Sequence, residues 1–201
     1  MHPLRPPSQT TTTARVRLSA IAVTCLLALS AALVAMPVRA NAPEPVLGAA
    51  LQGKQVVGNA RLRVWGFEVY DARLFAGADF DSARYAEQPF ALELSYLRNF
   101  KGPDIAERSI NEMRDLESIA PAQAEPWLAT MSRLFPDVKK GDRITGVHRP
   151  GRGAVFYLND RLLGEVADER FSRLFFGIWL SPKTSQPAMR ETLLQKVART
   201  P

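Results

Sequence analysis

Hydrophobic and polar residues alternate with a period of two in residues 89–100. Successive side chains of a strand point to opposite faces, so this alternation predicts a half-buried β-strand. Residues 48–77 are predicted to form two or three more strands, separated at Gly53, Gly58 and Gly66, with a β-bulge at Gly66. Within residues 89–100, one face carries Phe90, Leu92, Leu94, Tyr96 and Arg98, and the other carries Ala91, Glu93, Ser95 and Leu97.

Residues 64–77, VWGFEVYDARLFAG, raise a question that the alternation does not answer. Their aromatic and β-branched residues predict a strand. However, Glu68, Asp71 and Arg73 leave neither face purely apolar or purely polar. The segment is therefore either a core strand with solvated edges or one wall of a binding site.

The hydrophobic period becomes that of an α-helix in four later segments. Residues 102–117 begin with Pro103 and Asp104, which favour a helix start, and place apolar residues along one side. Further helices are predicted to begin at Pro126, near Asp168 and near Pro187. We interpret the apolar stripe of the third helix as core rather than as a membrane or cofactor face; it consists of Phe171, Leu174, Phe175, Ile178 and Trp179.

The remaining segments, 142–150 and 152–166, are predicted to be antiparallel strands with a tight turn at Asn159–Asp160. Strands, helices, strands and helices follow one another along the chain. This order indicates the α+β class, with helices on one face of an antiparallel sheet. No internal repeat or Gly/Ser linker interrupts residues 41–201, so we predict a single domain there.

Residues 1–40 have the pattern of a secretory signal peptide. Arg15 and Arg17 precede an apolar run of 17 residues, 20–36, and small residues precede a cleavage site after Ala40. This pattern predicts a periplasmic or secreted protein that is not inserted in the membrane after cleavage. Because the run is close to the length that crosses a bilayer, an uncleaved anchor is the alternative.

Removal of this leader changes the charge of the protein. The whole chain has 26 basic and 20 acidic residues and a formal net charge of +6. The leader contains four arginines and no carboxylate, so its loss lowers the net charge to +2. Such a small charge does not support a nucleic-acid partner. The single cysteine, Cys25, is lost as well, and the mature chain then depends on its core alone for stability.

Histidine is too scarce for several kinds of site. The mature chain keeps only His148, which precedes a predicted turn and is therefore expected to be a surface-loop residue. A His-rich zinc site and a Cys–His pair are excluded, and no metal is expected. The chain has no P-loop, GxGxxG or GxSxG motif, and no cofactor is expected.

Five strings of residues, taken in order, resemble the chalcone isomerase family, specifically its exported bacterial chalcone isomerase-like branch. They span most of residues 48–195 and read GNARLRVWGFEVYDARLF, ALELSYLRNFKGPDIAERSINEM, LFPDVKKGDRITGV, VFYLNDRLLGEV and FFGIWLSPKTSQPAMRETLL. The resemblance implies an open-faced β-sandwich, in which a curved antiparallel sheet and a layer of helices flank a cleft. Some members of the family close a flavanone ring, whereas others lack this activity and bind fatty acids.

The resemblance also assigns cleft positions. The arginine of the catalytic members falls at Arg61, with Arg63 as a competitor, and their strand threonine falls at Tyr70. Isoleucine at the position of their helix tyrosine cannot organise water at a substrate ketone, so flavonoid cyclisation by that mechanism is not expected. The positions of their helix tyrosine, lysine and asparagine hold Ile105, Arg108 and Glu112.

Three functions follow, of which we rank ligand binding first. The cleft would bind an amphipathic carboxylate such as a fatty acid, with Arg61 and Tyr70 at the head and Ile105 along the tail. Alternatively, Tyr70 and Glu112 would act as catalytic groups of an isomerase or intramolecular lyase on an enone. The third function is a non-catalytic interaction module of the cell envelope. Arg108 and Glu112, four residues apart on a helix, would otherwise form only an exposed ion pair.

Overall fold

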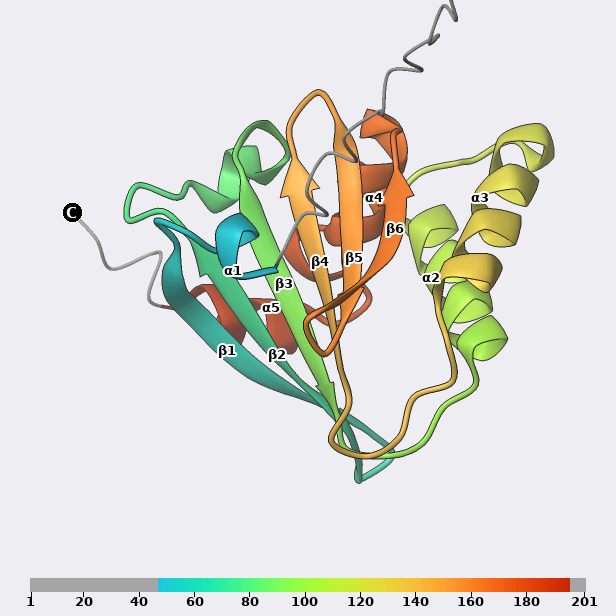
Figure 1. The fold of residues 1–201 in the computed structure, drawn as a ribbon, viewed down its shortest axis with the longest axis horizontal. Helices are drawn as coiled ribbons and strands as arrows, with labels where there is room; N and C mark the ends of the chain where they lie inside the picture. Colours follow the sequence, from blue (N-terminus) through green and yellow to red (C-terminus); the bar gives the residue numbers. More distant parts are fainter. Residues whose placement is uncertain (1–46, 196–201) are drawn as a thin grey trace, which may run out of the picture. The chain divides into compact units, whose positions relative to one another are not determined.

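Six antiparallel strands form one curved sheet, in which each strand pairs with its neighbours along the chain (Figure 1). The computed structural model describes residues 47–195. The first and last strands form the two edges of the sheet, which does not close into a barrel. The strands are β1 (Gln55–Val64), β2 (Phe67–Ala76), β3 (Phe90–Tyr96), β4 (Arg143–Arg149), β5 (Gly153–Leu158) and β6 (Arg161–Val166).

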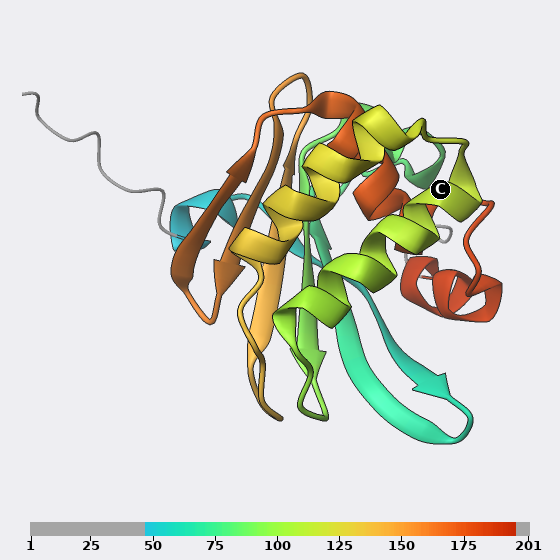
Figure 2. The same ribbon diagram turned by 90° about the vertical axis from the view of Figure 1, so that its right-hand side faces the viewer.

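Helices cover mainly one face of this sheet (Figure 2). We call the covered face the inner face. The main core cluster lies between the inner face and four helices. These helices are α2 (Gly102–Leu116), α3 (Pro121–Leu134), α4 (Glu169–Leu180) and α5 (Pro187–Leu194). The other, outer face carries a small cluster under the short helix α1 (Leu47–Ala50). A 3₁₀ helix, η1 (Ser82–Glu87), connects β2 to β3. The α+β class and the open-faced sandwich predicted from the sequence are confirmed.

Aromatic side chains fill much of the inner face. The ring of Phe156 on β5 is fully buried and meets Phe135, Phe171 and Phe175 edge-on, with centroids 5.1–6.4 Å apart. Edge-to-face contacts of this kind add to the gain from burial alone. Every residue of α4 from Leu174 to Leu180 is buried, so the core role predicted for this helix is confirmed.

Two-residue turns connect two of the hairpins. Asn159 and Asp160 have positive φ angles of 48° and 145° and join β5 to β6, as predicted. Trp65 and Gly66, with φ angles of 49° and 81°, join β1 to β2. The prediction of a β-bulge at Gly66 is therefore wrong, because this glycine supplies the left-handed backbone of a turn.

One helix boundary also differs from its prediction. Helix α3 begins at Pro121, and Pro126 lies inside it rather than at its start. Proline suits the first position because the N–H there has no partner within the helix. The sequence therefore offered two prolines as starting points, and the earlier one is used.

His148 is the largest correction to the sequence analysis. It lies on β4 with only 1% of its surface exposed, not in a surface loop. Its Nε2 lies 2.8 Å from the carbonyl oxygen of Ala86, which can only accept, so Nε2 carries the proton. Its Nδ1 then accepts from the hydroxyl of Ser172, 2.7 Å away. Burial lowers the pKa of His148, which is therefore neutral.

The predicted leader and the cleavage site after Ala40 lie outside the described residues. Within residues 47–195, no helix is long and apolar enough to cross a membrane.

Candidate functional site

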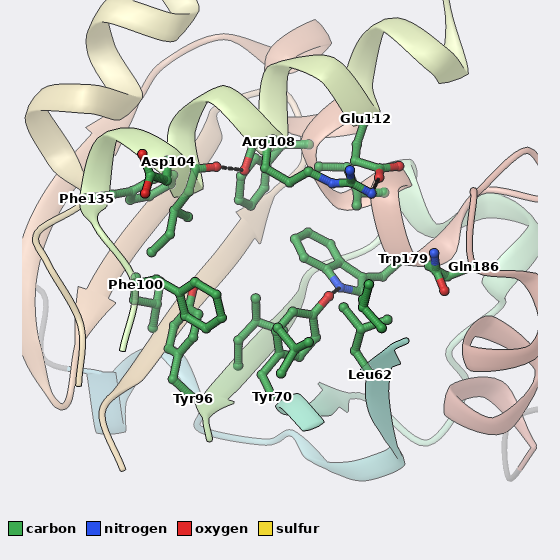
Figure 3. Close-up of a pocket in the computed structure, with 18 of the residues that line it drawn as sticks. Leu62, Tyr70, Tyr96, Phe100, Asp104, Arg108, Glu112, Phe135, Trp179 and Gln186 are labelled. Atoms are coloured by element: carbon green, nitrogen blue, oxygen red, sulfur yellow. Dashed lines mark hydrogen bonds and ion pairs between the residues drawn. The ribbon is translucent and has the colours of Figure 1, made fainter. Parts of the chain in front are cut away.

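A cavity of about 430 Å³ lies between the inner face of the sheet and helices α2 and α4 (Figure 3). This volume is in the range of small-molecule sites. Polar side chains come from the sheet, from the two helices and from the connection between α4 and α5; they are Tyr70, Tyr96, Asp104, Arg108, Ser109, Glu112, Trp179, Ser185 and Gln186. The rest of the wall is apolar and includes Leu62, Val64, Val69, Leu94, Phe100, Ile105, Phe135, Ile144, Phe175 and Ile178.

The register of the first three strands positions the floor of the cavity. Leu62 of β1 pairs with Tyr70 of β2, which pairs with Tyr96 of β3, so the three side chains share the inner face. Arg63 then pairs with Glu68, which leaves Val69 as the extra residue of a β-bulge. Bulges redirect side chains, and here both Val69 and its neighbour Tyr70 line the cavity.

Close packing at Gly102 positions the helical wall. A Cβ atom at this residue would lie 2.0 Å from the carbonyl oxygen of Phe135, so only glycine allows this approach. The N–H of Gly102 also donates to Asp137 Oδ1 at 3.0 Å. With its first turn fixed in this way, α2 directs Ile105, Ser109 and Glu112 toward the cavity, at positions i, i+4 and i+7.

Two tyrosine hydroxyls supply hydrogen-bond donors in the apolar wall. The Tyr70 oxygen accepts from Trp179 Nε1 at 2.9 Å, and its own proton has no acceptor among residues 47–195. The Tyr96 hydroxyl has no hydrogen-bond partner in the same part of the chain, and it lines the cavity although only 4% of the residue is exposed. Burial raises the pKa of both phenols well above the ordinary value, so both remain protonated at neutral pH. Both can therefore donate to an oxygen atom of a ligand.

Glu112 and Arg108 form an ion pair at the edge of the cavity. Glu112 Oε1 accepts from Arg108 Nη2, and Oε2 accepts from the Ser185 hydroxyl at 2.7 Å. The Glu112 side chain is buried, whereas 71% of the Arg108 side chain is exposed. The pair thus extends from the interior to the solvent, which is more than the exposed pair considered as the alternative.

Four of the five predicted ligand-binding residues line this cavity together: Tyr70, Ile105, Arg108 and Glu112. Arg61 does not. Its guanidinium bonds to Asp71 on the outer face, at 2.6 and 2.8 Å, and to Glu68 at 2.6 Å.

This placement of Arg61 corrects the sequence analysis, which directed it into the cleft. Side chains alternate along β1, and because Leu62 points inward, Arg61 points outward. Its competitor Arg63 is also directed outward, where it bonds to Glu68 at 2.9 Å.

Tyr96 and Trp179 also line the cavity, although neither was predicted from the sequence to be a site residue. The signal for Tyr96 was present, because the alternation had placed it on one face with Leu92 and Leu94. Trp179 had been assigned to the core, and only the structure reveals that its indole N–H bonds to Tyr70. Within residues 47–195 there is no group of three or more His, Cys, Asp or Glu residues arranged to hold a metal ion.

Comparisons with known proteins agree with this architecture. A family described as chalcone isomerase-like matches residues 53–195. An uncharacterised protein of Haemophilus influenzae is 32% identical over 143 residues, which cover 71% of this chain and 68% of that protein. A crystal structure of an Arabidopsis thaliana fatty-acid binding protein matches 73% of this chain and 89% of its own, with a TM-score of 0.58 and 12% identity. The latter similarity concerns the fold.

Proposed function

The chain belongs to the chalcone isomerase-like family, and from this premise we propose that its cavity binds an amphipathic carboxylate, such as a fatty acid, without transforming it. The observation that carries the proposal is the composition of the cavity wall. Long apolar surfaces are interrupted by a few donors, chiefly Tyr70, Tyr96 and Arg108. This is the usual arrangement of a site that buries an apolar ligand and fixes its orientation by a few polar contacts.

Arg108 and the Tyr70 hydroxyl lie toward one end of the cavity, whereas Asp104 and Tyr96 lie toward the other. Figure 3 shows Arg108, Glu112, Trp179 and Tyr70 on one side, and Phe100 and Phe135 on the other. Both Arg108 and Glu112 act electrostatically on the Tyr70 hydroxyl. The ligand carboxylate would therefore lie between Arg108 and Tyr70, and its tail would extend toward the phenylalanines.

Arg108 is suited to this role because of its exposure. It bonds to Glu112 through Nη2 alone, and within residues 47–195 its other guanidinium nitrogens have no acceptor. A carboxylate bound there would keep part of its hydration, which reduces the cost of burying a charge. Because Glu112 is paired with Arg108, its carboxylate would repel the ligand carboxylate only weakly.

Isothermal titration calorimetry with saturated and hydroxylated fatty acids tests this proposal. Hydroxylated chains are included because the Tyr96 hydroxyl near the tail has no partner in the described residues. Ile105→Trp should abolish binding by filling the cavity. Tyr70→Phe should weaken it by about tenfold or more, as expected for a lost hydrogen bond to a charged group. Arg61→Ala is the matched control, since this arginine lies on the other face.

Equal affinities in the wild type and Ile105→Trp would contradict binding in this cavity. A second approach is mass spectrometry of small molecules released when the protein, purified from its native compartment, is denatured. A stoichiometric acidic lipid would support the proposal.

Glu112 keeps an enzymatic alternative open, namely an isomerase or intramolecular lyase acting on an enone. Its carboxylate lines the same cavity as the Tyr70 hydroxyl, which provides a base and an acid. Both oxygens of Glu112 already accept hydrogen bonds from Arg108 and Ser185, so a substrate proton would have to compete with these contacts. Turnover of an enone that disappears in Glu112→Gln while ligand affinity is retained would favour this alternative.

We also propose that residues 1–40 direct export and are removed after Ala40. The supporting observation is the order of arginines, apolar run and small residues in the sequence. N-terminal sequencing of the protein from the periplasm tests this: a start at Asn41 is expected, whereas a retained run 20–36 would indicate an anchor.

A further inference from the structure

The turn between β1 and β2 exposes an unusual amount of apolar surface. Among the described residues, four large hydrophobic side chains are classed as exposed, and three of them lie at this turn. They are Val64, Trp65 and Phe67, which are 38%, 94% and 60% exposed. Single exposed hydrophobic residues are common, but a contiguous group of this kind marks an interaction site.

The local backbone gives no reason for a tryptophan at this position. Trp65 has a φ of 49°, and in two-residue hairpin turns this left-handed position favours Asn, Asp or Gly. The indole neither packs in the core nor relieves strain in the turn. Its exposure therefore requires another explanation.

Basic residues surround the exposed group. We define the loop end as residues 63–68, 97–101 and 137–141, three connections that converge at one end of the sheet (Figure 1). Backbone hydrogen bonds hold them together: the Leu97 N–H donates to the carbonyl of Val69, directly after the first connection, and the Phe100 N–H donates to the carbonyl of Val138. The loop end contains five basic and two acidic side chains.

Three of these cations have no carboxylate partner in the part of the chain that the structure describes. Within residues 47–195, Arg98, Lys139 and Lys140 take part in no ion pair. The guanidinium of Arg98 lies 4.8 Å from the centre of the exposed Phe67 ring. Exposed aromatic rings and unpaired cations thus occupy the same surface.

We propose that the loop end docks on the surface of an anionic lipid bilayer. The Trp65 and Phe67 rings would enter the interfacial layer, and Arg98, Lys139 and Lys140 would meet lipid phosphates. Amphipathic aromatic rings favour this layer, and each basic side chain near an anionic surface adds to binding. A protein partner fits less well, because the buried centres of protein interfaces are depleted in lysine.

Docking would also bring the cavity to the membrane. Val64 belongs both to the exposed group and to the wall of the cavity. The end of the cavity that Val64 and Phe100 line would then face lipid, from which an apolar ligand could enter. The docking itself rests on the loop end alone and does not require that the cavity bind a ligand.

Sedimentation with vesicles of phosphatidylcholine, with and without phosphatidylglycerol, tests the proposal. The wild type should bind the anionic vesicles preferentially. Replacing Arg98, Lys139 and Lys140 by Gln should weaken binding by roughly fivefold per charge removed. Trp65→Asn should also weaken it while preserving the fold, because Asn-Gly is a favourable sequence for this turn.

Matched controls show whether vesicle binding depends on the loop end, on the total charge of the protein or on the cavity. Gln at Arg114, Arg152 and Lys183 removes the same charge away from the loop end, from exposed residues that form no ion pair in the described part of the chain, and should leave binding unchanged. Ile105→Trp should lose the ligand of the cavity and still bind vesicles.

Quenching of tryptophan fluorescence tests whether the protein binds the bilayer through Trp65 or through another segment. Brominated lipids should quench tryptophan fluorescence more in the wild type than in Trp65→Phe, because this indole would lie in the lipid. Equal quenching, or equal vesicle binding by both triple variants, would overturn the proposal. Sedimentation velocity tests whether the loop end binds a second copy of the chain instead. If Trp65→Asn loses self-association but still binds vesicles as the wild type does, the proposal is wrong.

Discussion

The inner and outer faces of the sheet use the same strands in opposite ways. On the outer face, polar side chains satisfy one another across the strands: Arg61 bonds to Asp71, and Glu93 bonds to both Arg73 and Arg143. On the inner face, the hydroxyl of Tyr70, the residue next to Asp71, and the hydroxyl of Tyr96 donate their protons to no acceptor among residues 47–195. A side chain whose polar groups are already paired stabilises the fold, whereas an unpaired group in a cavity can bind a ligand.

The largest effect on stability is expected from removing an aromatic ring of the inner face. Phe156→Ala removes a fully buried ring from the aromatic cluster of β5 and α4. It should lower the free energy of unfolding by about 3–5 kcal/mol, through lost burial and the cavity that remains. Urea denaturation measures this loss. A value below about 1.5 kcal/mol would mean that the inner face is packed as loosely around Phe156 as around the cavity.

A smaller effect is expected from the buried carboxylate of the outer face. Glu93 is 5% exposed and accepts from Arg73 Nε at 2.9 Å, with Arg143 Nε at 3.3 Å from its other oxygen. Glu93→Gln should cost about 1–2 kcal/mol, because it weakens charged hydrogen bonds while both arginines can still reach water. Denaturation at low and high salt is the measurement. A more stable variant would mean that burying this charge costs more than its two partners return.

Which of these residues belongs to which face was only partly predictable from the sequence. The alternation in residues 89–100 was regular enough to assign Leu94 and Tyr96 to one face, and the structure agrees. Between β1 and β2, however, two register shifts interrupt the pairing, with Val57 as the extra residue of β1 and Val69 as the extra residue of β2. A shift of one residue exchanges the faces of a strand, so the orientation of Arg61 could not be deduced without knowing the register.

The burial of His148 and the network around Tyr70 were hidden for a different reason. Their partners Ser172, Ala86 and Trp179 are far away in the sequence and belong to separate elements. Sequence patterns identify a strand and its apolar positions, but they do not pair a polar group with one that is 24 to 109 residues away. The cavity itself depends on such pairings.

His148, which is buried on the inner face, should make the stability of the protein depend on pH. Burial lowers its folded pKa more than the Ala86 carbonyl and the charge of Glu169 raise it. Because the unfolded chain then takes up the proton first, near pH 6.5, stability should fall as the pH drops below that value. Between pH 7.5 and 5.5 the wild type should lose up to about 1 kcal/mol more than His148→Gln. An equal loss in the two proteins would assign the pH dependence to carboxylates instead.

The smallest effect is expected at Arg61, and it gives the sharpest contrast with Tyr70 on the neighbouring strand. The Arg61 side chain lies on the outer face and pairs only with exposed carboxylates, so its loss should shift the urea midpoint little. Arg61→Ala should bind fatty acids as the wild type does, while Tyr70→Phe should bind them more weakly. Calorimetry on the two variants compares a charge outside the cavity with a hydroxyl inside it. If Arg61→Ala loses the ligand and Tyr70→Phe keeps it, the head group binds on the outer face, and the inner cavity would have to serve another purpose.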